Sequence, residues 1–166
     1  MLVLGAGCST ASDPTPEPSD GGIEGVQTFG GLSREHTTDD VDYAQSPPVG
    51  GDHDPQWLDC TGTVFDEPVR NENAVHSLEH GAVWVTHSAA ASEADIDSLA
   101  AKVTGQPYSF MSPYPDQDSP IVLTAWGVQL GVDKANDPRI GEFLTTYRSG
   151  PQTPEPGATC EAGEMP

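Results

Sequence analysis

Basic residues are scarce in this sequence: six lysines and arginines stand against 26 aspartates and glutamates, for a formal net charge of −20. A surface of that sign repels the phosphate backbone of nucleic acids and anionic lipid headgroups. Nucleic-acid binding is therefore excluded. The same charge keeps a protein soluble and attracts cations, and the second property bears on the histidines described below.

Cysteine is nearly absent as well, with only Cys8, Cys60 and Cys160 in 166 residues. None belongs to a Cys-x-x-Cys pair, which argues against a zinc ribbon or a thioredoxin-type redox motif. In an oxidising compartment we expect Cys60 to pair with Cys160, leaving Cys8 odd. That bond would close a loop of about 100 residues. The alternatives are two free thiols, or one thiol that binds a metal.

Other patterns are missing too. No stretch approaches 18 consecutive apolar residues, so no segment is expected to span a bilayer. The glycine patterns of serine hydrolases, P-loops and dinucleotide-binding folds do not occur, so nucleophilic serine and nucleotide chemistry have no support.

The N-terminus instead carries a short apolar run, residues 1–8, that ends in Ala6-Gly7-Cys8. This resembles a lipobox, in which the cysteine receives a diacylglycerol and fatty-acyl (palmitate) anchor. The charged start of a signal peptide is missing, so we expect the true precursor to begin further upstream. Residues 9–22, rich in Pro, Ser and Asp, predict a disordered tether. The expected partner is thus the membrane, through a lipid anchor on its extracytoplasmic face; no protein partner is indicated.

Residues 23–149 are expected to form one globular domain, and residues 150–166 a Pro/Gly-rich tail pinned by Cys160. The order of elements predicts an α+β fold: a mixed sheet with two or three helices packed on it and long irregular N-terminal loops. The expected strands are 23–29, 107–111 (at an edge), 121–126, 128–132 and the apolar run 82–86; the expected helices are 72–80, one capped by Ser92, and one capped by Asn136 or Asp137.

All five histidines lie between residues 36 and 87, and the segment HSLEH is the most informative. On a helix, His76 and His80 are one turn apart and share a face. Two imidazoles at that spacing can chelate one metal ion. Glu79 and Glu72 fall on the same face and are expected to orient the ligand histidines through hydrogen bonds.

Two further residues complete the expected site. His53 follows Gly50 and Gly51, whose flexibility could bring its imidazole to the helix as a third ligand. Met111, at the end of an expected strand, is a possible fourth. A mixed His/Met set suits copper better than zinc, so we expect a transition metal ion, with copper favoured.

Two alternatives stay open. His-x-x-Glu-His is also the pattern of inverzincin peptidases, in which Glu79 would be the general base of a zinc hydrolase. The helix is expected to end at Gly81, and the chain is small for a substrate cleft, so an enzyme is the less favoured hypothesis. In the other alternative, His76 and His80 bond the backbone at a helix C-terminus, and the chain is a non-catalytic envelope interaction protein.

Four segments resemble a known family, namely VDYAQSPPVGGDHDPQWLDCTG, NENAVHSLEHGAVWVTH, GQPYSFMSPYPDQDSPIVLTAWG and PQTPEPGATC. They are similar to secreted actinobacterial lipoproteins of domain of unknown function 3105, over roughly residues 23–160. The resemblance implies an envelope lipoprotein and supplies no catalytic residue. Its motif histidines correspond to His53, His76 and His80. His87 departs from the pattern, where an aromatic residue is expected.

Overall fold

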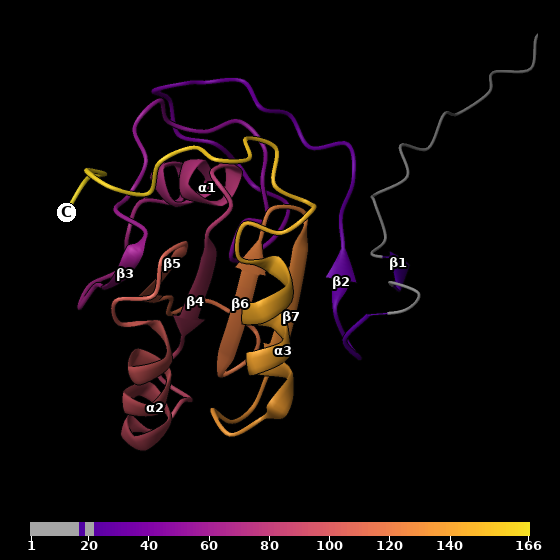
Figure 1. The fold of residues 1–166 in the computed structure, drawn as a ribbon, viewed down its shortest axis with the longest axis vertical. Helices are drawn as coiled ribbons and strands as arrows, with labels where there is room; N and C mark the ends of the chain where they lie inside the picture. The colour runs from indigo at the N-terminus through magenta and orange to yellow at the C-terminus, as the bar shows by residue number, and fades with distance from the viewer. Residues whose placement is uncertain (1–16, 19–21) are drawn as a thin grey trace, which may run out of the picture.

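The computed structural model describes residues 17–18 and 22–166 of the chain. Seven strands form one mixed sheet in the order β1-β2-β7-β6-β4-β5-β3, with three helices packed around it (Figure 1). The predicted α+β class is confirmed. The lipobox with Cys8 and most of the expected tether lie outside the described residues.

The elements are short, as expected for a small domain. The strands are β1 (Glu17–Pro18), β2 (Gln27–Thr28), β3 (Thr61–Val64), β4 (Val83–His87), β5 (Ser109–Pro113), β6 (Ile121–Ala125) and β7 (Val128–Val132). The helices are α1 (Asn71–Glu79), α2 (Glu93–Val103) and α3 (Pro138–Tyr147). Strands β3, β5 and β4 run parallel to one another, and the remaining pairs are antiparallel.

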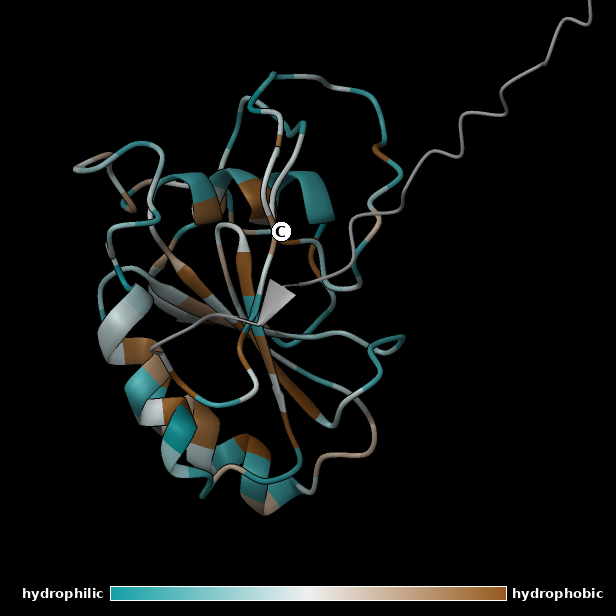
Figure 2. Ribbon diagram, turned by 90° about the vertical axis from the view of Figure 1, so that its right-hand side faces the viewer, coloured by the Kyte–Doolittle hydropathy of each residue, from teal (hydrophilic) through white to brown (hydrophobic). Residues whose placement is uncertain are grey.

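The sheet separates two hydrophobic cores. Along β4, Val83 and Val85 belong to the core that α2 and α3 cover, whereas Trp84 belongs to the core under α1. This follows from the strand geometry, in which successive side chains point to opposite faces. Apolar residues accordingly concentrate along the strands and on the inner sides of the helices (Figure 2). The site described below therefore lies on the α1 face alone.

Two strand predictions were wrong in position. The expected edge strand begins later, at Ser109, and lies inside the sheet between β4 and β3. Because Pro107 precedes the strand, its missing N–H costs no ladder bond. The edge strand next to β5 is β3. Its sequence, Thr-Gly-Thr-Val, has no strong apolar alternation from which a strand could be predicted. The strand expected over 23–29 is reduced to Gln27–Thr28.

The helix boundaries follow the predicted caps. The Ser92 hydroxyl accepts a hydrogen bond from the Asp95 backbone N–H, and the Asp137 carboxylate accepts one from Arg139 N–H. Helix α1 ends at Glu79, with His80 as its C-cap and Gly81 at a φ of 104°. That turn sends the chain directly into β4.

The predicted disulfide is confirmed: Cys60 and Cys160 are bonded, with their Cα atoms 4.7 Å apart. The bond holds the C-terminal segment beside α1, where the yellow trace in Figure 1 crosses the helix. Backbone hydrogen bonds from Cys60 N–H to Cys160 O and from Glu155 N–H to Glu79 O fix the same segment. Within residues 17–18 and 22–166, no helix has the length and apolar character needed to cross a membrane.

Candidate metal centre

Helix α1 supplies two side chains to the site. His76 and Glu79 are three residues apart, so they project from neighbouring positions of one helix face. Ala74 and Leu78 point the other way and are fully buried against the sheet. The packing of the apolar face therefore fixes the direction in which the two polar side chains point.

The long loop before β3 supplies two histidines. A short parallel bridge joins His36 to His53, through hydrogen bonds from Thr37 N–H to His53 O (2.8 Å) and from His53 N–H to Glu35 O (3.0 Å). Gly50 and Gly51 precede His53 with φ of 147° and 122°, a backbone shape that side chains disfavour. The two glycines thus let the loop turn and direct His53 towards α1.

These four residues form a group that can hold a metal ion, here called the metal centre: His36, His53, His76 and Glu79 offer one ligand atom each, and all four atoms lie within 4.8 Å of one another. His53, His76 and Glu79 are buried, and His36 is exposed. The His36 ring lies 4.8 Å from that of His53 and 5.1 Å from that of His76. Three of the four residues are therefore shielded from solvent, and only His36 is exposed to it.

Backbone carbonyls set the protonation of the two buried rings. His53 Nδ1 lies 2.8 Å from Gly51 O, and His76 Nδ1 lies 2.7 Å from Asp54 O. A carbonyl oxygen only accepts hydrogen bonds, so each Nδ1 carries the proton. In the neutral form of each ring, Nε2 is then left with its lone pair free, which is the state in which histidine binds metals.

The contact between His53 and Glu79 is the most unusual feature of the site. His53 Nε2 is 2.9 Å from Glu79 Oε2, yet the two atoms are not aligned for a hydrogen bond, and Nε2 is buried without a hydrogen-bond partner. With a neutral His53 ring, two electron-rich atoms face each other away from water, an arrangement that is costly unless a positive charge compensates it. A proton on Nε2 can supply that charge, and so can a metal ion bound to both atoms.

Burial also keeps His76 neutral. Desolvation lowers the pKa of His76 to about 4, with a smaller contribution from the neighbouring His80, His53 and His36, while the bond to the Asp54 carbonyl acts in the opposite direction. At neutral pH the ring is uncharged and its Nε2 can coordinate a metal.

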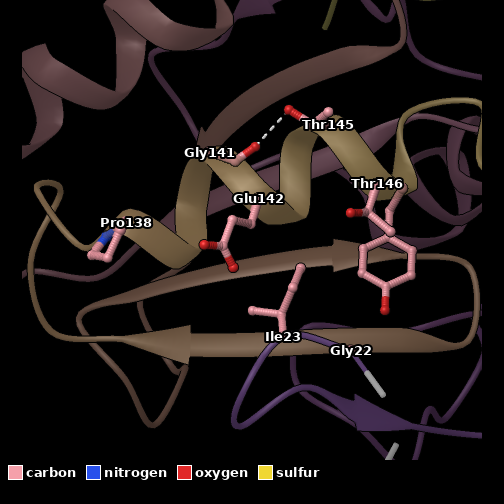
Figure 3. A pocket seen from close by; sticks show the side chains of 8 residues that line it. Gly22, Ile23, Pro138, Gly141, Glu142, Thr145 and Thr146 are labelled. Carbon is pink, nitrogen blue, oxygen red and sulfur yellow. Dashed lines mark hydrogen bonds between the residues drawn. The ribbon is translucent and has the colours of Figure 1, made fainter. Parts of the chain in front are cut away.

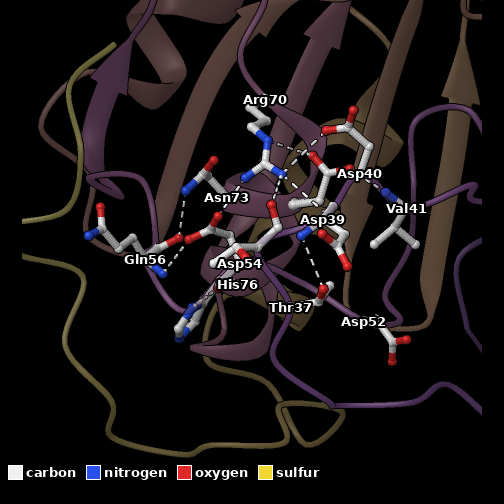
Figure 4. Close-up of polar contacts among 12 residues, drawn as sticks. Thr37, Asp39, Asp40, Val41, Asp52, Asp54, Gln56, Arg70, Asn73 and His76 are labelled. Atoms are coloured by element: carbon white, nitrogen blue, oxygen red, sulfur yellow. Dashed lines mark hydrogen bonds and ion pairs between the residues drawn. The ribbon is translucent and has the colours of Figure 1, made fainter.

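Arg70 orders the segment that holds His76. It forms an ion pair with Asp54 (Figure 4). It also pairs with Glu72, which accepts a hydrogen bond from Val41 N–H. Because the Asp54 carbonyl holds His76 Nδ1, this network positions the ring. Glu72, expected behind the ligands, therefore faces Arg70 and the loop and acts on the centre only through Asp54.

His80 and Met111 are not brought into the group. His80 is the C-cap of α1, and its ring lies 4.6 Å from that of His76, but its Nδ1 bonds Thr159 O and its Nε2 faces Glu155. Met111 belongs to the core under α2 and α3, on the opposite face of the sheet. The sheet therefore separates the Met111 sulfur from the histidines.

Sequence reasoning missed His36 and gave Glu79 a supporting role. The available signal for His36 was the concentration of histidines between residues 36 and 87. For Glu79, the spacing of three residues from His76 was as favourable as the spacing of four to His80.

The donor set consists of three imidazole nitrogens and one carboxylate oxygen, which suits first-row divalent ions such as Zn²⁺ or Cu²⁺. In the hydrolase hypothesis Glu79 acts on a metal-bound water. Here its carboxylate lies among the ligand atoms, and Trp57 and Trp126 lie next to the histidine rings. Glu79 is thus placed with the ligand atoms themselves, not beyond them as a general base would be.

A surface pocket lies elsewhere. It has a volume of about 670 Å³ and opens between α3 and residues 22–23, lined by side chains such as Ile23, Glu142 and Thr146 (Figure 3). None of its lining residues is a histidine or a cysteine, so the pocket is separate from the metal centre.

No curated protein and no solved structure matches the chain. A family model does: the one described as "Protein of unknown function (DUF3105)" matches residues 35–162, which contain all four residues of the metal centre and both disulfide cysteines. The match spans more than half of the chain, and the chain therefore belongs to the DUF3105 family.

Proposed function

We propose that this protein is an extracytoplasmic lipoprotein that holds one transition metal ion in the centre of His36, His53, His76 and Glu79. The observation that carries the metal proposal is the buried Nε2 of His53, which has no hydrogen-bond partner and faces Glu79 Oε2 at 2.9 Å. Histidines with a purely structural role would have both ring nitrogens satisfied by protein groups.

Copper remains the first metal to test, for a reason other than the one the sequence suggested. With Met111 on the far face of the sheet, its thioether does not favour Cu⁺ at this site. Nitrogen and oxygen ligands, however, bind Cu²⁺ more tightly than Zn²⁺ in general. A storage, delivery or sensing role fits such a site and needs no catalysis.

The first test measures metal directly. The protein, purified without added metal or chelator, is expected to contain close to one equivalent of a transition metal by elemental analysis. The metal-stripped protein is expected to take up one equivalent of Cu²⁺ or Zn²⁺ tightly. Uptake equal to that of a His53→Ala, His76→Ala double variant would disprove the proposal.

The lipid anchor supports a location on the outer face of the membrane. Residues 1–8 resemble a lipobox, and the Cys60–Cys160 bond suits an oxidising compartment. A single acyl chain gives only marginal membrane binding, so the diacylglycerol and the additional acyl group would act together.

The anchor has its own test. In a host that processes lipoproteins, and with a complete signal segment added upstream, the protein is expected to incorporate labelled palmitate and to partition into detergent. Cys8→Ala is expected to do neither, because no other cysteine is free. Equal labelling of wild type and Cys8→Ala would contradict the assignment.

A further inference from the structure

His80 is the histidine of the HSLEH motif that does not belong to the metal centre. It is 4% exposed and lies at the end of α1, directly after Glu79. Its ring is held in the same way as the two buried ligand histidines, with Nδ1 2.7 Å from a backbone carbonyl oxygen, that of Thr159. In the neutral form of the ring the proton is therefore on Nδ1, and Nε2 presents a free lone pair.

The nearest charged group to this lone pair is on the C-terminal segment. Glu155 Oε2 lies 3.8 Å from His80 Nε2, and no hydrogen bond joins the two atoms. With the His80 proton on Nδ1, both atoms are acceptors, as in the pair formed by His53 and Glu79. The distance is too long for a hydrogen bond. Two ligands bound to one ion at about 2.1 Å each lie about 3–4 Å apart, so the spacing fits a shared metal ion.

The backbone holds this pair in place. The Glu155 N–H donates to the carbonyl oxygen of Glu79, and the disulfide at Cys160 adjoins Thr159, whose carbonyl orients His80. The Glu155 side chain is 50% exposed, so the pair opens to solvent. The Trp57 ring lies 5.0 Å from the His80 ring and covers it on one side.

We infer that His80 and Glu155 form a second metal position, here called the outer pair, for a divalent transition metal ion. It has two protein ligands and is open to water, so it binds more weakly than the metal centre and exchanges its ion faster. The second histidine of HSLEH thus serves a separate position, one residue along the chain from a ligand of the centre. The outer pair does not depend on the metal centre being occupied.

The test is a calorimetric titration of the metal-stripped full chain with Zn²⁺. Wild type is expected to bind two ions, one tightly and one weakly, and Glu155→Gln is expected to lose the weak one through a drop in affinity of at least about 10-fold. Glu161→Gln, which changes another exposed glutamate of the same segment, is the matched control and should still bind two.

Two further variants separate this inference from the proposed function. His80→Ala should behave like Glu155→Gln, whereas His76→Ala should lose the tight ion and keep the weak one. A single ion in wild type that disappears in His76→Ala but not in Glu155→Gln would overturn the outer pair and leave the proposed function intact. A weak ion that survives in both His80→Ala and Glu155→Gln would also overturn it.

Discussion

Replacing His76 by alanine is expected to lower the affinity of the metal centre by at least about 100-fold, because even residues that only support metal ligands contribute 10- to 100-fold. His76 is 5% exposed, and the Asp54 carbonyl fixes its ring so that Nε2 faces the other ligand atoms. His53→Ala is expected to have an effect of the same size. Competition against a chromophoric chelator, with Cu²⁺ and Zn²⁺ in turn, measures these affinities.

His36→Ala provides a graded comparison, because His36 is the one exposed member of the centre. Water can replace an exposed ligand more easily than a buried one, so its loss should weaken binding less and should speed the release of the ion. His87→Ala, at the end of β4, is the matched control and should bind like wild type. Equal affinities for His76→Ala and His87→Ala would refute the assignment of the centre.

The free energy of unfolding of the same variants gives a second measure of metal binding. A ligand present at about 100 times its dissociation constant stabilises the folded state by about 2.7 kcal/mol. Wild type is expected to gain that much with added metal in a denaturant titration, and His76→Ala should gain almost nothing at the same metal concentration. A gain of similar size in both proteins would mean that the metal binds elsewhere.

Glu79→Gln distinguishes a ligand from a general base. Glu79 is 2% exposed, and its carboxylate lies among the ligand atoms. As a ligand, its replacement by the uncharged amide should reduce metal affinity as strongly as the loss of a histidine. A general base would leave the affinity unchanged and abolish only hydrolysis, so a variant with wild-type metal affinity would revive the hydrolase hypothesis.

The parts of the fold that the sequence predicted were those with a local physical signal. Strands β4 and β6 are continuous apolar runs, and Ser92 and Asp137 are residue types that cap helices through their own side chains. The disulfide followed from a count of only three cysteines. Strand β3 gave no such signal, because its four residues lie at an edge and are defined by their partner β5.

The metal centre was predictable only in part, for a similar reason. A helix places His76, Glu79 and His80 close together, but which of them meet the loop is decided by tertiary packing. The bridge between His36 and His53 joins residues that no local pattern relates. Met111 alternates with Phe110 along β5, and only the register of the sheet shows that Phe110, not Met111, faces α1.

Removing the disulfide with a Cys60→Ser, Cys160→Ser double variant is expected to lower the free energy of unfolding by about 4–5 kcal/mol, because a cross-link over a loop of this length restricts the unfolded chain by that amount. The cysteines are 100 residues apart and both are buried. Denaturant titrations of the oxidised protein and the variant measure the difference. Adding reductant should bring the wild-type curve to that of the variant and leave the variant unchanged.

Removing the disulfide should weaken metal binding at the outer pair but not at the metal centre. Thr159 and Glu155 belong to the segment that the bond holds, so the outer pair should weaken when the segment loosens. The metal centre draws its residues from α1 and the loop before β3 and should keep its affinity under conditions in which the variant stays folded. A stability loss below about 1 kcal/mol would show that backbone contacts such as Glu164 N–H to Trp57 O hold the segment without the bond. An equal loss of both ions in the folded variant would show that the segment also braces the metal centre.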